Sequence, residues 1–124
     1  MIYLAVAVGG ALGALSRFGI GQWLADSGYA HLHPETLLVN VIGALLIGIL
    51  FIGAERFTLS EPARLGMSVG FLGAFTTFSA FLLQLLTDIQ EGQVLRAVTY
   101  AAATVFLCLI SCLVGRELAR SVFD

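Results

Sequence analysis

An amide side chain lies inside one of the long apolar stretches of this sequence. Asn40 is the only asparagine in the chain, and it falls within an uncharged run at residues 36–54. Its side chain offers N–H donors and one acceptor oxygen, and such a group is costly to bury among apolar groups unless it is hydrogen-bonded. Two interpretations follow for Asn40: a hydrogen bond to a neighbouring helix, or a donor that lines a path for an anion.

A second segment, residues 70–81, combines glycine, paired threonine, serine and four phenylalanines within another uncharged run. Glycine and threonine both weaken an α-helix. A helix broken here would release carbonyl groups that must be buried in protein or coordinate an ion. Carbonyl oxygens without a nearby carboxylate suit a monovalent cation such as Na⁺ better than Ca²⁺. On composition alone, an unbroken helix whose threonines bond to their own turn is the favoured interpretation.

A third set of polar residues lies in the last apolar stretch. Tyr100, Thr104 and Cys108 are spaced four residues apart, which places them along one face of a helix. Their polar groups could line a narrow wet path, or the hydroxyls could bond to carbonyls of their own helix. No acidic or basic side chain lies in this stripe, so it offers no candidate for a proton relay or for a counter-ion to a charged substrate.

The elements that position these residues are predicted to be membrane helices. Of the 124 residues, 59% are hydrophobic and 11% charged, none is lysine, and the mean hydropathy is +0.98. A soluble domain carries about 25% charged residues, so these values exclude a soluble globule, a disordered chain and a basic nucleic-acid-binding domain. Because a span needs about 20 residues, the sequence predicts a single all-α membrane domain over residues 1–124. Its four transmembrane helices are expected at about 2–25, 35–56, 62–88 and 95–120.

The arginines say little about orientation in the membrane. With four spans, one side receives four arginines and the other two, and all the loops are short. The positive-inside rule then predicts either a mild preference or insertion in both orientations. Four short helices are too few to enclose an aqueous path, so a path would run along a groove or between subunits. Gly66-x-x-x-Gly70 is a close-packing spacing, which predicts packing within one subunit and also a dimer interface.

The remaining candidates have simpler interpretations. Arg17 could raise the local concentration of anions at a vestibule, or it could bond at an interface or extend towards the membrane surface. His31 and His33 are expected to be a solvated loop pair rather than a metal site. Cys108 and Cys112 are expected to be reduced. No cluster of titratable residues lies inside the predicted spans, so the sequence does not indicate an enzyme.

Three motifs carry a resemblance to a known family. They are Gly9-Gly10-x-x-Gly13-Ala14-x-x-Arg17, then Thr36-Leu37-Leu38-Val39-Asn40-x-x-Gly43, and Gly70-Phe71-Leu72-Gly73-Ala74-Phe75-Thr76-Thr77-Phe78-Ser79 followed by Phe81. Through these motifs the chain resembles the small fluoride channels of the Fluc/CrcB family. The resemblance covers essentially the whole chain, including its length and its four spans.

This resemblance implies an antiparallel, dual-topology homodimer in a bacterial inner membrane, with a break in the third helix. Two fluoride pores would allow passive export of fluoride and so protect the cell from its toxicity. A structural Na⁺ would be buried at the dimer interface, held by the backbone carbonyls of Gly73 and Thr76 from both subunits. Fluoride, lipid and a second copy of the chain would be the partners, with no nucleic acid and no soluble protein. The fluoride path would comprise Asn40, Phe78, Phe81, Ser79, Tyr100, Thr104 and Cys108.

The physical chemistry of fluoride agrees with this implication. Fluoride is small and strongly hydrated, so a selective path must replace its water shell with closely spaced donors. Amide and hydroxyl groups can serve, and the electropositive ring edges of Phe78 and Phe81 can approach an anion. Three residues depart from the usual family pattern: Ala80, Gln84 and Cys108 stand where threonine, glutamate and serine are common. These departures weaken the predicted outer part of the path.

Two other functional classes fit parts of the sequence. A small multidrug exporter also has four short spans, but it would need a membrane carboxylate in the first helix, and residues 1–25 contain no aspartate or glutamate. A structural subunit that scaffolds a larger complex is the other alternative. Fluoride efflux from liposomes would distinguish a channel from both.

Overall fold

The computed structural model describes residues 1–25 and 28–123, and every regular element within these ranges is helical. Four helical segments are long and apolar enough to cross a membrane, which confirms the predicted number of transmembrane helices; they are Ile2–Ala25, Pro34–Arg56, Glu61–Gln90 and Val94–Phe123. In order, the elements are α1 (Ile2–Ala25), η1 (Ala30–Leu32), α2 (Pro34–Arg56), α3 (Glu61–Leu65), η2 (Gly66–Leu72), α4 (Gly73–Phe75), α5 (Ser79–Gln90) and α6 (Val94–Phe123).

Local sequence signals account for where the helices begin and turn. Pro34 opens α2 at its first turn, a position where a missing N–H costs nothing. The Ser60 hydroxyl accepts a hydrogen bond from the backbone N–H of Ala63 at 3.4 Å and so caps α3. Gly92 adopts a φ of +75° in the connection between α5 and α6, a conformation that glycine reaches without strain.

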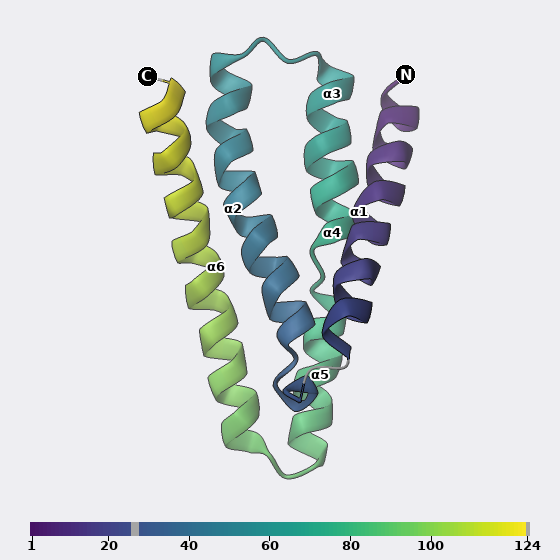
Figure 1. The fold of residues 1–124 in the computed structure, drawn as a ribbon, viewed down its shortest axis with the longest axis vertical. Coiled ribbons are helices and arrows are strands. Elements are labelled where there is room, and N and C mark those ends of the chain that lie inside the picture. The colour runs from purple at the N-terminus through teal and green to yellow at the C-terminus, as the bar shows by residue number, and fades with distance from the viewer. Residues whose placement is uncertain (26–27, 124) are drawn as a thin grey trace.

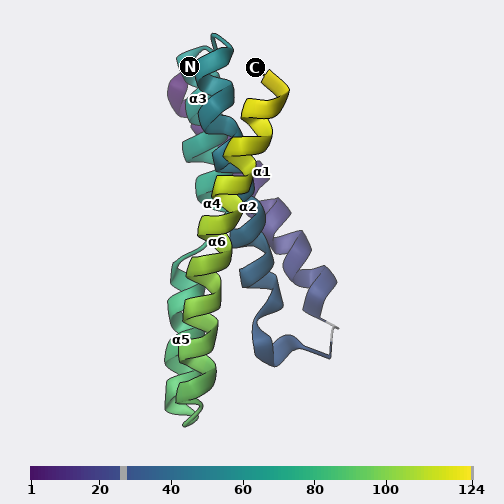
Figure 2. The same ribbon diagram turned by 90° about the vertical axis from the view of Figure 1, so that its left-hand side faces the viewer.

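The four spans run up and down, so that both termini and the α2–α3 connection lie at one end of the molecule (Figure 1). The α5–α6 connection lies at the opposite end. Helices α2 and α6 form the most extensive contact, α1 packs mainly against η2 and α4, and α5 packs against α6. Viewed from the side, α5 and the first half of α6 run together, while the second half of α1 diverges from them (Figure 2).

Glycines allow the backbones of α2 and α6 to touch. A Cβ atom added at Gly48 would collide with the backbone carbonyl of Cys112, and one added at Gly115 would collide with that of Leu45. Both glycines are buried. Such close approach of small residues is a common source of helix association in membranes, where the hydrophobic effect between helices is absent.

The Gly66-x-x-x-Gly70 motif packs against α1 within the same subunit. A Cβ at Gly70 would lie 2.6 Å from the Val6 carbonyl oxygen, and one at Gly66 would lie 3.0 Å from that of Ala5. The predicted packing within one subunit is therefore confirmed for this motif.

Few large apolar side chains are buried within the subunit. The buried hydrophobic residues are Val39, Ile52, Leu72, Phe75, Phe81, Ala97, Tyr100 and Ala119. Many large apolar side chains are exposed, mainly on the first, third and fourth spans, whereas most of those on α2 are half-buried; the exposed set is far larger than a water-soluble monomer presents. The outer surface of the bundle is therefore suited to contact with lipid and with other membrane helices.

Candidate functional site

Residues 76–78 lie between α4, which ends at Phe75, and α5, which begins at Ser79. Thr76 has φ −82° and ψ 160°, an extended conformation. Its hydroxyl donates a hydrogen bond to the Leu72 carbonyl at 2.9 Å. This is the back-bond expected of a helical threonine, and here it occurs at the last turn of α4. We refer to these residues as the 76–78 segment.

The Asn40 side chain holds this segment from α2. Its Nδ2 donates to the Thr77 carbonyl oxygen at 2.9 Å, and its Oδ1 accepts from the Thr77 backbone N–H at 2.8 Å. One amide therefore satisfies both backbone groups of a residue outside the helices. The hydrogen-bonding interpretation of Asn40 describes these contacts. Because Nδ2 carries two hydrogens, the same side chain can also donate to a ligand.

Two carbonyl oxygens beside this amide lose their helical partners. In an α-helix, the Gly73 oxygen would accept from the Thr77 N–H, and the Thr76 oxygen from the Ala80 N–H. Instead, the Thr77 N–H donates to Asn40, and the Ala80 N–H donates to the Thr77 hydroxyl at 3.3 Å. Gly73 is exposed and Thr76 is half-buried. These oxygens fit the carbonyl ligands that a monovalent cation such as Na⁺ prefers.

Gly73 and Thr76 also line the same open cleft, which we call the carbonyl cleft. It has a volume of about 310 Å³ and is lined by Asn40, Gly43, Ala44, Ile47, Ser68, Leu72, Gly73 and Thr76. None of these residues is acidic. A single subunit supplies only two of the predicted carbonyl ligands, and Na⁺-sized cations bound by oxygen generally take more.

A second cleft, on another side of Asn40, gathers most of the residues predicted for the fluoride path. We call it the aromatic cleft; its volume is about 240 Å³, and it is lined by Asn40, Thr76, Thr77, Phe78, Phe81, Thr104, Val105 and Cys108. The rings of Phe78 and Phe81 lie 5.8 Å apart and are tilted by 41°. Phe81 is buried, whereas Phe78 is 69% exposed. The cleft is therefore open at one side.

Thr104 brings an unusual polar group to the aromatic cleft. The residue is 6% exposed, and its hydroxyl is buried without a hydrogen-bond partner among the described residues. A buried hydroxyl without a partner costs free energy, and in folded proteins it usually has one. A donor in this position, in a cleft without acidic or basic side chains, is suited to an anion.

Two predicted path residues do not line the aromatic cleft. Ser79 is exposed at the first residue of α5. The Tyr100 hydroxyl donates to Oε1 of Gln84 at 2.8 Å. The Tyr100 ring packs edge-on against Phe81, with the ring centroids 5.3 Å apart. Tyr100 therefore packs against the buried Phe81 ring and does not line the aromatic cleft.

Gln84, which the sequence showed only as a departure from a pattern, joins three helices. Its Nε2 donates to the Thr36 hydroxyl at 2.8 Å and to the Glu35 carboxylate at 3.2 Å, while its Oε1 accepts from Tyr100. Gln84, Glu35 and Thr36 also border a cleft of about 320 Å³ that includes Arg17. The spacing of these residues gives no sequence signal, because they lie on different spans.

Arg17 bonds inside the bundle. Its Nε donates to the Ala74 carbonyl oxygen at 3.0 Å, two residues before the 76–78 segment begins. The residue is half-buried. Of the interpretations left open for Arg17, bonding at an interface between helices describes this contact. Arg17 also lines the cleft of about 320 Å³.

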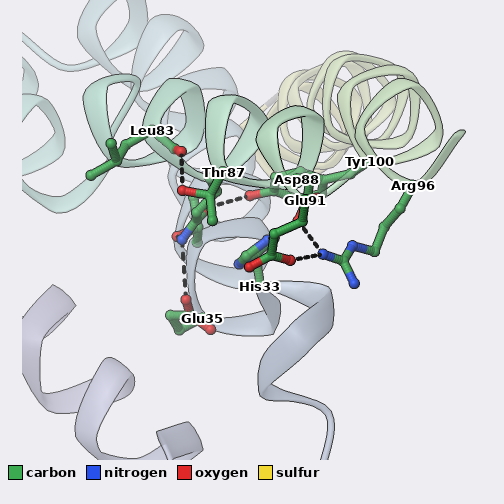
Figure 3. A network of polar contacts seen from close by, with 10 residues as sticks. His33, Glu35, Leu83, Thr87, Asp88, Glu91, Arg96 and Tyr100 are labelled. Carbon is green, nitrogen blue, oxygen red and sulfur yellow. Dashed lines mark hydrogen bonds and ion pairs between the residues drawn. The ribbon is translucent and has the colours of Figure 1, made fainter. Parts of the chain in front are cut away.

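An ionic network joins the ends of α2, α5 and α6 (Figure 3). The Asp88 side chain is 1% exposed, and its Oδ1 lies 2.6 Å from Nη2 of Arg96. The same nitrogen is 3.0 Å from Glu91. Oδ1 of Asp88 also lies 3.4 Å from Nε2 of His33. The pairing of Asp88 with a cation compensates for much of the cost of burying its charge.

This network corrects the prediction of a solvated histidine pair. His31 is exposed, but the His33 side chain is only 17% exposed and packs against the Tyr100 ring at 5.2 Å. The turn before Pro34 places His33 in a left-handed conformation with φ 52°, and its ring lies against α5 and α6. Neither histidine belongs to a metal-binding group of three or more ligating side chains within the part of the chain that the structure describes.

Comparison with known proteins identifies the family. A family model described as "CrcB-like protein, Camphor Resistance (CrcB)" matches residues 4–116. A protein of Thermus thermophilus named "Fluoride-specific ion channel FluC" is 43% identical over 120 residues, which cover 97% of this chain and 94% of the relative. A protein of the same name from Pseudomonas fluorescens is 40% identical over 96% of this chain and 97% of the relative.

A third relative with this name, from Idiomarina loihiensis, is 39% identical over 86% of this chain and 83% of its own length. Together with the four membrane-capable helices, these matches make the chain a multi-pass integral membrane protein, like its bacterial relatives. The chain belongs to the CrcB-like family, which comprises ion channels and not enzymes.

Proposed function

We propose that this protein is a fluoride-selective channel that exports fluoride passively and so protects the cell from fluoride toxicity. The relatives named as fluoride-specific channels support this function. The observation that carries it for this chain is the buried Thr104 hydroxyl, which has no hydrogen-bond partner in the part of the chain that the structure describes. It lies in the aromatic cleft with the Asn40 amide and the Phe78 and Phe81 rings. These groups offer an anion donors and ring edges in a place without acidic side chains.

The proposed selectivity follows from the cost of removing water from fluoride. A small, strongly hydrated anion enters an apolar environment only where donors replace its water shell. Asn40 and Thr104 provide N–H and O–H donors, and the edges of Phe78 and Phe81 provide weaker positive potential. A larger halide fits such closely spaced donors less well. Passive transport agrees with the absence of acidic and basic side chains among the residues that line the aromatic cleft.

We further propose that two copies associate as an antiparallel homodimer with two pores. The aromatic cleft is open at Phe78, which is 69% exposed, so a second subunit is needed to enclose a path. The weak bias of the arginines, four on one side and two on the other, agrees with insertion in both orientations. In this arrangement Ser79, which is exposed at the start of α5, belongs to the path only where the partner's surface completes it. Tyr100 contributes through its packing against the Phe81 ring.

The 76–78 segment is, in this proposal, the functional break of the third membrane helix. The carbonyl oxygens of Gly73 and Thr76 would hold a structural Na⁺ at the dimer interface, with equivalent oxygens of the second copy. Their loss of helical hydrogen-bond partners supports this assignment. The bound cation would link the subunits and lower the cost of an anion nearby.

A flux measurement tests the proposed function. Purified protein is reconstituted into liposomes loaded with fluoride, and a fluoride electrode records efflux after the membrane potential is set to zero. The wild-type protein is expected to release fluoride. Asn40→Asp is expected to abolish release, because a carboxylate replaces a donor with a negative charge. No release by the wild-type protein would contradict the channel and favour a scaffold subunit; normal release by Asn40→Asp would contradict Asn40 as a donor to the ion.

A further inference from the structure

We propose that Asn40 is a positioning residue for the cation site as well as a donor in the fluoride path. Its side chain determines which carbonyl oxygens near the 76–78 segment are left to bind the cation. This inference rests on the proposed Na⁺ site but concerns a different property, the link between the carbonyl and aromatic clefts. Asn40 is one of the residues that line both clefts.

The first step is the competition for one N–H group. The Thr77 N–H could donate either to the Gly73 oxygen, as in a continuous helix, or to another acceptor. Asn40 supplies that acceptor at 2.8 Å. The Gly73 oxygen is then free to bind a cation because the amide of Asn40 has taken its partner. Without the acceptor at position 40, the Thr77 N–H can return to Gly73 and withdraw the oxygen from the carbonyl cleft.

The second step concerns the neighbouring carbonyl oxygens that do not bind the cation. The Thr77 oxygen accepts from Nδ2 of Asn40, and the Ala74 oxygen accepts from Arg17. Phe75 is buried and does not line the carbonyl cleft. The side chains of Asn40 and Arg17 therefore occupy two neighbouring oxygens, and the oxygens of Gly73 and Thr76, two residues that line the carbonyl cleft, remain for a cation. Selection of this kind fixes the ligand set before any cation arrives.

The two bonds of Asn40 can be separated by substitution. Asn40→Leu has a similar shape and removes both bonds. Asn40→Asp keeps an oxygen that accepts from the Thr77 N–H but loses the donor to the Thr77 oxygen. If the acceptor positions the Gly73 carbonyl, Asn40→Leu weakens cation binding and Asn40→Asp does not. Fluoride flux, by contrast, is expected to fail in both variants, so flux alone would not reveal the positioning role.

The experiment measures the thermal unfolding of detergent-solubilised dimer as Na⁺ replaces N-methylglucamine at constant ionic strength. A cation that binds the native protein raises the unfolding temperature with its concentration, and the Na⁺ concentration at half-maximal shift reports affinity. This half-maximal concentration is expected to rise about tenfold or more in Asn40→Leu, the effect of one lost ligand interaction of ordinary strength. In Asn40→Asp it is expected to stay at or below the wild-type value.

Ser111→Ala is the matched control. The Ser111 hydroxyl donates to the Val41 carbonyl at 2.9 Å, so this variant also removes a side-chain bond to a neighbouring helix. It is expected to lower the unfolding temperature without changing the half-maximal Na⁺ concentration.

The outcomes separate the inference from the proposal on which it rests. A wild-type protein without any Na⁺ response overturns the cation site and this inference, while the flux assay still decides the channel. A normal Na⁺ response in Asn40→Leu overturns the positioning role alone. If Asn40→Leu gives no folded dimer, Asn40→Ala, which also removes both bonds, takes its place: a raised half-maximal Na⁺ concentration supports the inference, and a wild-type value contradicts it.

Discussion

At the scale of single residues, Asn40 and Thr104 differ in how they use their hydrogen-bonding groups at the aromatic cleft. Asn40 uses part of its hydrogen-bonding capacity to hold Thr77, whereas the hydroxyl of Thr104 has no partner among the described residues. An unpartnered buried hydroxyl is unfavourable for folding alone. In the proposed channel, this hydroxyl serves as a donor to the ion.

Thr104→Val tests this explanation, because valine has the shape of threonine without the hydroxyl. Removal of an unsatisfied polar group is expected to leave the unfolding temperature unchanged or to raise it. Fluoride flux through reconstituted protein is expected to fall about tenfold, as one donor to the ion is lost. Thr99→Val on the same helix is the control: its hydroxyl bonds to the Leu95 carbonyl at 2.8 Å on the exposed surface, and flux should not change. A fall in stability with unchanged flux for Thr104→Val would show a purely structural role.

At the scale of elements, the packing of α2 against α6 fixes the position of Asn40 relative to Thr104. The two backbones meet at Gly48 and Gly115. Because the contact is between main chains, it cannot adjust by rotating a side chain. Any Cβ atom there must move one helix relative to the other.

Gly48→Ala is expected to lower stability by about 1–3 kcal/mol through overpacking, measured by unfolding in mixed micelles. Gly21→Ala provides the comparison, since a Cβ atom at Gly21 meets no atom within 4 Å. That substitution should be neutral or stabilise α1 by up to about 1 kcal/mol, as alanine favours helix over glycine. Equal effects of the two substitutions would contradict the close α2–α6 contact.

The elements also show what the sequence could and could not predict. The number of spans and their approximate ends follow from uncharged runs, prolines and Gly92, which act locally. The geometry of the 76–78 segment could not be decided from composition, because it depends on an acceptor from α2 that competes for the Thr77 N–H. Thr76 accordingly shows both an extended backbone and the helical back-bond that an unbroken helix predicts.

The polar networks were missed for a similar reason. Gln84 contacts residues 48 and 49 positions away in the sequence, and the His33–Asp88 contact spans 55 positions. No periodic pattern encodes such pairs. Asp88 and Arg96 are closer in sequence, but only the turn at Gly92 brings the end of α5 against the start of α6.

At the scale of the whole molecule, both termini lie at the end opposite the α5–α6 connection (Figure 1). A reporter at each end therefore reads the orientation of a subunit directly. Many large apolar side chains on the bundle are exposed, so a second subunit can pack against them in a parallel or an antiparallel orientation.

Ser121→Cys and Gln93→Cys are suitable reporters in a background without Cys108 and Cys112, as both positions are exposed, Gln93 directly precedes α6 and Ser121 lies near its end. If the protein inserts in both orientations, a membrane-impermeant maleimide applied to intact cells should label about half of each reporter, because the arginine distribution gives no strong bias. Labelling of one reporter alone would show a single orientation and contradict the antiparallel dimer.

The most direct test of the central claim compares two halides in the same reconstituted vesicles. Liposomes loaded with equal concentrations of fluoride and chloride are monitored by ion-selective electrodes after protein-mediated efflux is started. A path that replaces the water of a small anion with closely spaced donors predicts release of fluoride at least about a hundredfold faster than chloride, a difference of about 2.7 kcal/mol. Release of chloride at a comparable rate would contradict the account.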